Sequence, residues 1–449
     1  MNFLTSWLNR SFFIRSVLLY SCLMAILTLM QTSKGPTVEI IGLQVVFTIS
    51  VIIFSRLYTY KSIISTCFII LVFQLLMQFG LRFFYYHYFD NPLGYNPADA
   101  YWYDYIAEYH MTSPISEFKR FLDENNVYID DRGMNYVTYL IYHIAGTHVR
   151  GLQFAIIANS IAISFSSYFV YKLGRLYFDK KVSTFITFVW GTELYAVYTA
   201  ASGLKENYML ALILPAFYFL AKLYKYFELK NIIYFFIFAS SALLFRMALF
   251  YMLVLSFFVV IFLRFPFIRK YIVFFTITGI IVVCVYYYNV VDTIALERGY
   301  SYDALDKISD NKLGHSGMIA QFLNYFAGFI GPFPNIVATG VKANYITMFS
   351  FSSFCKVMYS FFFIYGAYAA IRYRKYEYVP LLSFWLMHIV MLLFTFFTQH
   401  DRYQWPHIPI MLIIAALGGI EWHRHRHYIV WDKIYFVFAM FLIVFFNFR

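Results

Sequence analysis

Residues 62–81 read SIISTCFIILVFQLLMQFGL and carry no charged side chain. An apolar stretch of about 20 residues is long enough to cross the hydrocarbon core of a bilayer as one helix. Comparable stretches recur along the 449-residue chain, which is 61% hydrophobic and 13% charged. That charged fraction is about half of what a soluble domain carries. The sequence therefore predicts an all-α, polytopic membrane protein that forms a single integral membrane domain over residues 1–449.

Hydropathy and length predict about thirteen membrane-spanning helices. The predicted spans are 11–30, 38–55, 62–81, 151–172, 182–201, 207–224, 230–246, 247–264, 271–290, 351–371, 378–398, 404–420 and 428–447. Residues 134–147 are too short to span and are expected to lie along the outer surface as an interfacial helix. Residues 318–337 are interrupted by GPFP at 331–334 and are expected to form a re-entrant or interfacial segment.

The distribution of charge predicts the topology. Lys and Arg gather in short loops that alternate between the predicted spans, which places those loops and the N-terminus in the cytoplasm. Residues 83–135 instead hold nine acidic against three basic residues, so the loop at 83–150 is expected outside, as is a second loop at 291–350. A net charge of +12 is also typical of nucleic-acid binding, but these cations are dispersed through loops, and membrane topology explains them better.

The acidic loop begins with PADAYWYDYIAEYH at 97–110. On a helix, Asp99, Tyr103 and Ala107 share one face, while Asp104 and Glu108 lie on a neighbouring strip. One face can therefore present the Asp99 carboxylate to a cleft. The alternative is that Asp99 caps the helix start, and the two roles are compatible.

Cationic residues are predicted at the same outer face. Lys205 and Glu206 follow a Ser-Gly turn at the start of the span 207–224, either as interfacial anchors or as part of a site. Arg246 lies between two apolar runs, where a guanidinium needs an anion or a polar cavity, unless it only marks a turn between helices.

A further polar turn, QHDRY at 399–403, opens the span 404–420. It provides His400, Arg402 and Tyr403 as candidate substrate-binding residues. Arg402 is suited to hold phosphate oxygens with its forked donors, although an internal pair with Asp401 is the simpler alternative.

Together these elements resemble the GT-C superfamily, multi-span glycosyltransferases that use polyprenyl-phosphate-linked sugars. The resemblance lies in the Asp99, Tyr103 and Ala107 element, in NYVTYLIYHIAGTHVRGLQFAIIANS at 135–160, in SGLKE at 202–206 and in RYQWPHIPIMLIIAALGG at 402–419. Their order matches over about residues 80–265 and 399–420. The SGLKE turn and the GPFP segment look most like the branch from bacterial capsule and exopolysaccharide clusters, which includes polymerases of repeat units. The chain departs from the common pattern in two extra spans before the acidic loop and in having no soluble domain after the last helix.

The resemblance implies an enzyme in the bacterial inner membrane with its active site on the periplasmic side. Asp99 would be the catalytic base, with Asp104 as its nearby substitute. Arg246, Arg402 and Lys205 would hold the phosphate of an undecaprenyl-type lipid-linked sugar, and a glycan or glycolipid would be the acceptor. No cofactor is indicated, but a divalent metal shared by Asp99, Asp104 and Glu108 remains open.

Besides a purely structural or scaffold protein, two other functions remain open from the sequence. One is a polymerase that joins lipid-linked repeat units, as in O-antigen or capsule synthesis. The other is a lipid-oligosaccharide flippase or other transporter, for which charges along a central pathway are expected.

Overall fold

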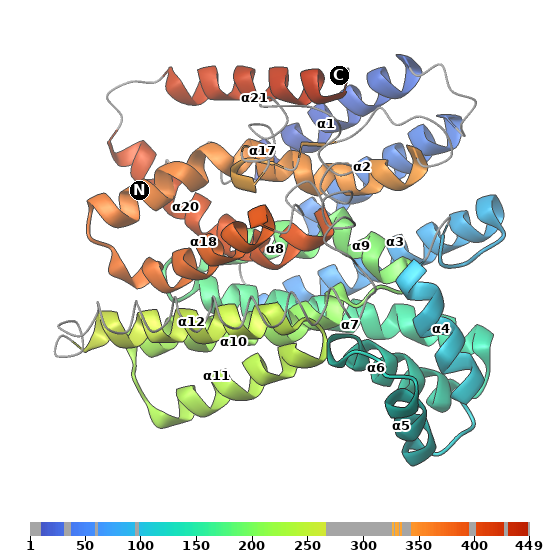
Figure 1. Cartoon of the computed structure of the whole chain (residues 1–449). Helices are drawn as coiled ribbons and strands as arrows, with labels where there is room; N and C mark the ends of the chain where they lie inside the picture. Colours follow the sequence, from blue (N-terminus) through green and yellow to red (C-terminus); the bar gives the residue numbers. More distant parts are fainter. Residues whose placement is uncertain are drawn as a thin grey trace.

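The computed structural model describes residues 10–30, 37–58, 62–94, 98–265, 326, 328–331, 333–334, 343–394, 401–425 and 430–447. These residues form helices and connecting turns and contain no β-strand (Figure 1). The α-helices are α1 (Arg10–Met30), α2 (Thr37–Leu57), α3 (Ile63–Phe89), α4 (Ala98–His110), α5 (Ile115–Glu124), α6 (Ile129–Ala145), α7 (His148–Gly174), α8 (Lys180–Gly191), α9 (Leu194–Ala201), α10 (Glu206–Lys225), α11 (Leu229–Ser241), α12 (Met247–Arg264), α17 (Ala343–Arg372), α18 (Val379–Phe394), α19 (Asp401–Gln404), α20 (Ile408–Arg424) and α21 (Trp431–Asn447).

Among the described residues, seven helical segments are long and apolar enough to cross a membrane, which indicates a multi-pass membrane protein. They are Ile63–Phe89, His148–Gly174, Glu206–Lys225, Met247–Arg264, Ser352–Arg372, Tyr376–Leu393 and Arg402–Arg424. The predicted spans that fall on described residues are helical, but this does not establish the predicted total of about thirteen. The predicted span at 271–290 lies outside the described residues, as does most of the 318–337 segment.

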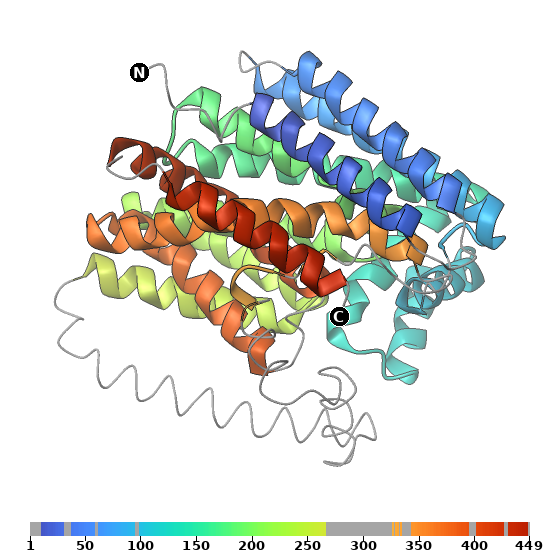
Figure 2. The ribbon, with the colours of Figure 1, turned by 90° about the horizontal axis from the view of Figure 1, so that it is seen from above.

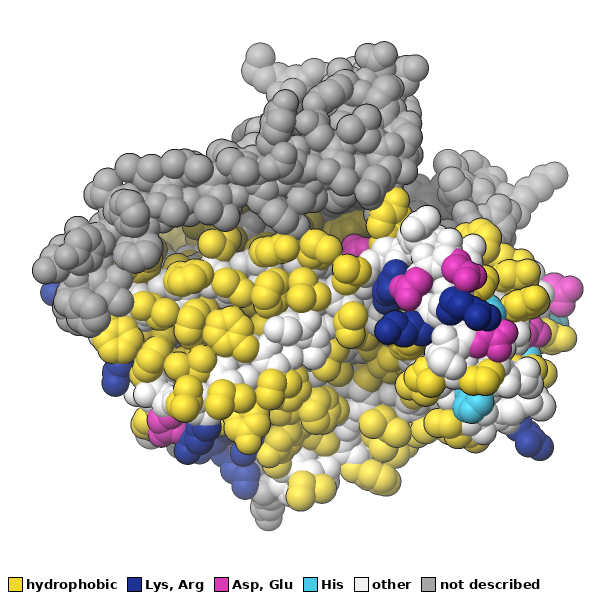
Figure 3. All heavy atoms as spheres, turned by 60° about the horizontal axis from the view of Figure 1, so that its bottom comes forward, with side chains coloured by type: hydrophobic (Ala, Val, Ile, Leu, Met, Phe, Trp, Pro, Cys, Tyr) yellow, Lys and Arg dark blue, Asp and Glu magenta, His cyan; other side chains and the backbone are white. Residues whose placement is uncertain are grey.

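The helices share two ends. At one end, which we call the basic end, Lys225 of α10 binds the carbonyl oxygen of Leu176, and Lys375 lies 2.7 Å from Glu421 of α20. At the opposite end, which we call the α4 end, the starts of α7 and α10 and the short helix α19 meet α4 and α6, and the residue before α12 contacts the start of α10 (Figures 1 and 2). Figure 3 shows a broad apolar surface between these two ends, with Lys and Arg prevailing at one and a mixture of acidic and basic groups at the other. The charge pattern predicted that successive helices run in alternating directions and present apolar sides between the two ends.

The predicted span at 182–201 is a broken helix. Helix α8 ends at Gly191, and α9 starts at Leu194 after Thr192 and Glu193. The side-chain amide of Gln74 donates to the Gly191 carbonyl at 2.8 Å, and Arg82 donates to the Ala201 carbonyl at 2.9 Å. Carbonyl groups freed at a helix break need such donors where no water is present. The prediction of one continuous helix here was therefore wrong, and polar side chains of α3 stabilise the two pieces.

The acidic loop forms a helical layer of α4, α5 and α6 that covers the α4 end (Figure 1). In α5, Phe118 and Leu122 are four residues apart and fully buried, while its charged side chains face out. These two residues pack with Tyr139 of α6. An amphipathic layer of this kind suits a membrane surface, as predicted for the helix at 134–147.

Helices α17 and α20 cross with their backbones in contact. A Cβ atom added to Gly418 would lie 1.8 Å from the Phe362 carbonyl oxygen, and one added to Gly366 would lie 2.1 Å from that of Ile414. Glycine is therefore required at both positions for this crossing, since any larger residue would push the helices apart.

Candidate functional site

The centre of the charged cluster at the α4 end is Glu206, the first residue of α10. Its carboxylate is fully buried and accepts a hydrogen bond from Nε of Arg402. Nη2 of Arg246 lies 3.6 Å from the same oxygen, Oε1. Two guanidinium groups from distant parts of the sequence therefore share one buried carboxylate, which is what makes the burial of these charges tolerable.

Arg402 also reaches the surface of the molecule. Its Nη1 donates to Oδ2 of Asp99 at 2.6 Å, so a single guanidinium joins the buried Glu206 to a carboxylate at the start of α4. The Asp99 side chain is 49% exposed, and that of Arg402 is 24% exposed. Asp99 lies in the first turn of α4, and its carboxylate is part of the cluster.

Arg246 lies at the sharp connection between α11 and α12, where its backbone N–H donates to the Ala242 carbonyl at 2.7 Å. This matches the alternative that Arg246 marks a turn, yet its side chain points inward. The guanidinium stacks over the ring of Tyr403, 4.7 Å from the ring centroid. Its Nη1 and the Oε2 of Glu206 are buried and have no hydrogen-bond partner among the described residues. Both atoms are thus available to a polar ligand.

Lys205 is held on the other side of Glu206 by the acidic layer. Its ammonium group is paired with Asp131 of α6 and donates to the Asp130 carbonyl at 2.8 Å, and the hydroxyl of Tyr103 donates to Asp131 at 2.8 Å. Because the Lys205 side chain is only 7% exposed, simple interfacial anchoring does not describe it. Nothing in the sequence singles out Asp131 among the nine acidic residues of this loop.

The electrostatics of this pair predict a dependence of stability on pH. Burial raises the pKa of Asp131, but Lys205 and the Tyr103 hydroxyl outweigh it, so the pKa lies below its ordinary value of 3.8. A depressed pKa contributes stability that is complete above the ordinary value and is lost as the pH falls through the folded-state value. In thermal unfolding of detergent-solubilised protein between pH 6 and about pH 3, we expect Asp131→Asn to weaken this loss. An unchanged profile would contradict the role of the pair.

Asp104 and Glu108 belong to a second cluster at the α4 end. Nε2 of His148, the first residue of α7, lies 3.0 Å from Oδ2 of Asp104, and its Nδ1 lies 3.7 Å from Oε1 of Glu108. The hydroxyl of Tyr142 donates to Oδ1 of Asp104. The described residues therefore group Asp104 and Glu108 with His148 and not with Asp99, unlike the predicted three-acid set. His148 and Tyr142 thus orient the Asp104 carboxylate. Their contacts with Asp104 are separate from the hydrogen bond that holds Asp99.

Polar residues deeper in the bundle were not predicted from the sequence. His388 of α18 and His407 face each other with their Nδ1 atoms 3.0 Å apart, and both Nε2 atoms are buried without a partner among the described residues. Glu193, at the break between α8 and α9, accepts a hydrogen bond of 2.5 Å from Ser352. An acid in the middle of a predicted span was the one signal that could have revealed this interior.

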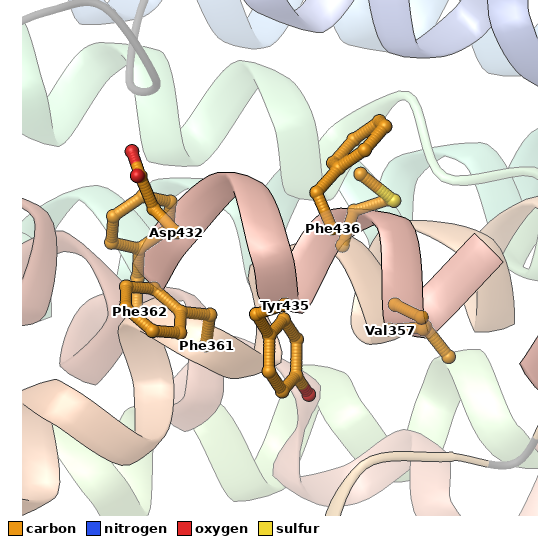
Figure 4. A pocket seen from close by; sticks show the side chains of 8 residues that line it. Val357, Phe361, Phe362, Asp432, Tyr435 and Phe436 are labelled. Atoms are coloured by element: carbon orange, nitrogen blue, oxygen red, sulfur yellow. The ribbon is translucent and has the colours of Figure 1, made fainter. Parts of the chain in front are cut away.

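Two cavities of the described chain lie away from these clusters. Val357, Phe361 and Phe362 of α17 and Tyr435 and Phe436 of α21 line a small pocket of about 10 Å³ (Figure 4). The second is an apolar groove between α3 and α7, lined in part by Cys67, Leu71 and Tyr168. Neither is lined by Asp99, Glu206, Arg246 or Arg402.

The structure thus brings together Asp99, Lys205, Glu206, Arg246, Arg402 and Tyr403 from the predicted site residues. His400 lies outside the described residues. Comparison with protein-family models, with curated proteins and with solved structures gives no match for this chain.

Proposed function

We propose that this protein is a membrane glycosyltransferase, which transfers a sugar from a polyprenyl-phosphate donor to a glycan or glycolipid acceptor in the synthesis of cell-surface polysaccharide. The observation that carries the proposal is the hydrogen bond between Arg402 and the half-exposed Asp99, at one end of an apolar helical bundle. Transfer from a lipid phosphate requires a base for the incoming hydroxyl and cations for the departing phosphate, both near the headgroup plane. The Asp99–Arg402 pair supplies one of each.

The pair suggests how the donor binds. A phosphate is a better partner than a carboxylate for the forked donors of an arginine, so the donor phosphate replaces Asp99 at Nη1 of Arg402. Glu206 keeps Nε of Arg402 in place while this exchange occurs. The exchange frees the Asp99 carboxylate at the surface, where an acceptor hydroxyl can reach it.

The reaction that follows is a single displacement with inversion. The acceptor oxygen forms a bond to the anomeric carbon as the bond from that carbon to the phosphate oxygen breaks, through an oxocarbenium-like transition state. The acceptor proton passes to Asp99, and the polyprenyl phosphate leaves with its added negative charge next to Arg402 and Arg246. No redox partner is needed, and membrane lipids are the only other contact that the proposal requires.

The proposal places the basic end in the cytoplasm and the α4 end on the periplasmic side of a bacterial inner membrane. Lys and Arg in short loops favour the cytoplasm, and the basic residues at the ends of α10, α12 and α17 support this orientation. Reaction at the opposite face suits a lipid-linked donor, because a nucleotide sugar would not be present there.

Asp99→Asn is the variant that tests the mechanism. Loss of a general base typically lowers a rate by about 10²–10⁴-fold, and we expect at least 10²-fold here. Transfer of labelled sugar from a short-chain polyprenyl-phosphate donor is measured in detergent or proteoliposomes. Glu117→Gln, on the exposed side of α5, is the matched control and should keep full activity.

Other outcomes identify the competing functions. A ladder of products from a lipid-linked oligosaccharide alone would identify a polymerase. If Asp99→Asn leaves sugar transfer intact but abolishes lipid translocation in vesicles, the protein is a transporter and the proposal is wrong. Equal transfer by Asp99→Asn and the control would also refute it.

A further inference from the structure

The second cluster at the α4 end has the composition of a metal site. Asp104 and Glu108 are four residues apart on α4 and lie on one face, and His148 approaches them from the start of α7. Each offers one ligand atom, and these three atoms lie within 4.8 Å of one another. One imidazole with two carboxylates suits a divalent first-row metal such as Mn²⁺ or Zn²⁺.

The closest pair of atoms already has the spacing that a shared ion needs. Nε2 of His148 and Oδ2 of Asp104 are 3.0 Å apart, and two ligands about 2.1 Å from one metal lie roughly 3 Å apart at neighbouring coordination positions. Glu108 is more distant, but its side chain is 47% exposed and can rotate by the small amount required. Water would complete the coordination at this partly exposed position.

Neighbouring groups orient the Asp104 carboxylate for this task. The Tyr142 hydroxyl donates to Oδ1, and Nε2 of His148 lies 3.0 Å from Oδ2 and 3.2 Å from Oδ1. Outer hydrogen bonds of this kind are what fix the ligating carboxylates of metal sites. Arg82 is a buried cation nearby, and it donates hydrogen bonds to the carbonyl oxygens of Ala201 and Leu152.

We infer that Asp104, Glu108 and His148 bind a divalent transition metal that fastens α4 to the start of α7. Such an ion would hold the helix that carries Asp99 against the bundle. The inference goes beyond the proposed function and does not depend on it. The hydrogen bonds and ion pairs of this site are separate from those of Arg402 and Glu206.

The test is direct metal binding by the full chain. Chelator-treated protein, purified in detergent with an affinity tag free of histidine, is titrated with Mn²⁺ and followed by the loss of the free-ion EPR signal. We expect one equivalent to bind, and His148→Ala and Glu108→Gln each to weaken binding at least tenfold. His143→Ala and Glu117→Gln replace exposed residues of the same acidic layer and should leave binding unchanged. Size-exclusion profiles confirm that each variant is folded.

A second measurement follows the fastening of α4. Backbone hydrogen exchange over residues 98–110 should slow when Mn²⁺ is added to the native chain and should not respond in His148→Ala. Absence of stoichiometric binding of both Mn²⁺ and Zn²⁺, or binding that the His148→Ala, Glu108→Gln double variant retains, would overturn the inference. Since no sugar substrate is used, these results are independent of whether the protein transfers sugars.

Discussion

Replacing Glu206 by glutamine is expected to destabilise the protein by about 3–5 kcal/mol, the range found when one partner of a buried ion pair is removed. Glu206 is fully buried and its Oε1 is the common partner of Arg402 and Arg246. Glutamine keeps the shape of the side chain but not its charge, so both guanidinium groups would lose their shared counterion. The loss would be seen as a lower yield of monodisperse protein and a lower unfolding temperature in detergent.

Two companions make the Glu206 experiment specific. Glu117→Gln makes the same chemical change on the exposed side of α5 and should be close to neutral. Glu206→Asp retains the charge at a shorter reach and should fall between the two. A Glu206→Gln protein as stable as the native chain would mean that another anion balances the two arginines, and the central role given to Glu206 would then be incorrect.

Gly418→Ala should be the most disruptive single-methyl change among the glycines described. The added Cβ would lie 1.8 Å from the Phe362 carbonyl oxygen and 2.7 Å from the Gly366 backbone nitrogen, neither of which belongs to a flexible side chain. Helices α17 and α20 would have to separate, and because Arg402 lies in α19 shortly before α20 begins, the charged cluster would shift with it. We expect a loss of about 3 kcal/mol, the upper part of the range for overpacked sites.

Gly80→Ala in α3 is the matched control, since nothing lies within 4 Å of the Cβ it would add. Alanine is favoured over glycine in a helix by up to about 1 kcal/mol, so this variant should be neutral or slightly more stable. Unfolding temperatures of the two variants in the same detergent give the comparison. Equal stability of Gly418→Ala and Gly80→Ala would show that the α17–α20 crossing is looser than described.

The sequence predicted the helices better than the details that connect them. Apolar length predicted α10 and α12 nearly to the residue and α7 to within a few residues, because membrane helices are defined by a property that local sequence records. Helix α3 continues to Phe89, well beyond the predicted end at residue 81. The proximity of Arg402 and Glu206, nearly two hundred residues apart, followed from topology, since alternating spans bring their starting ends to one face. Their sharing of one carboxylate did not follow, because it depends on side-chain packing.

Other features had weak signals or none. Residues 182–201 are apolar except for Glu193 and polar uncharged residues, so hydropathy joined α8 and α9 into one helix. His148 lies just before the predicted span 151–172 and was not singled out as a partner of Asp104, since periodicity within α4 says nothing of which distant residue faces it. The pairing of Lys205 with Asp131 was equally invisible, because nine acids of the same loop compete for the same cation.

The break between α8 and α9 has a consequence for how the chain is assembled in the membrane. Residues 182–202 are buried throughout, and the carbonyls at the ends of both pieces depend on Gln74 and Arg82 of α3. Hydrocarbon offers no donor to replace them, so the pair would be poorly stable as an isolated inserted segment. The pair of α8 and α9 reaches its final packing only when α3 is already in place and α17 and α20 then pack against it. The N-terminal half of the chain therefore reaches its final packing only after synthesis of the C-terminal half.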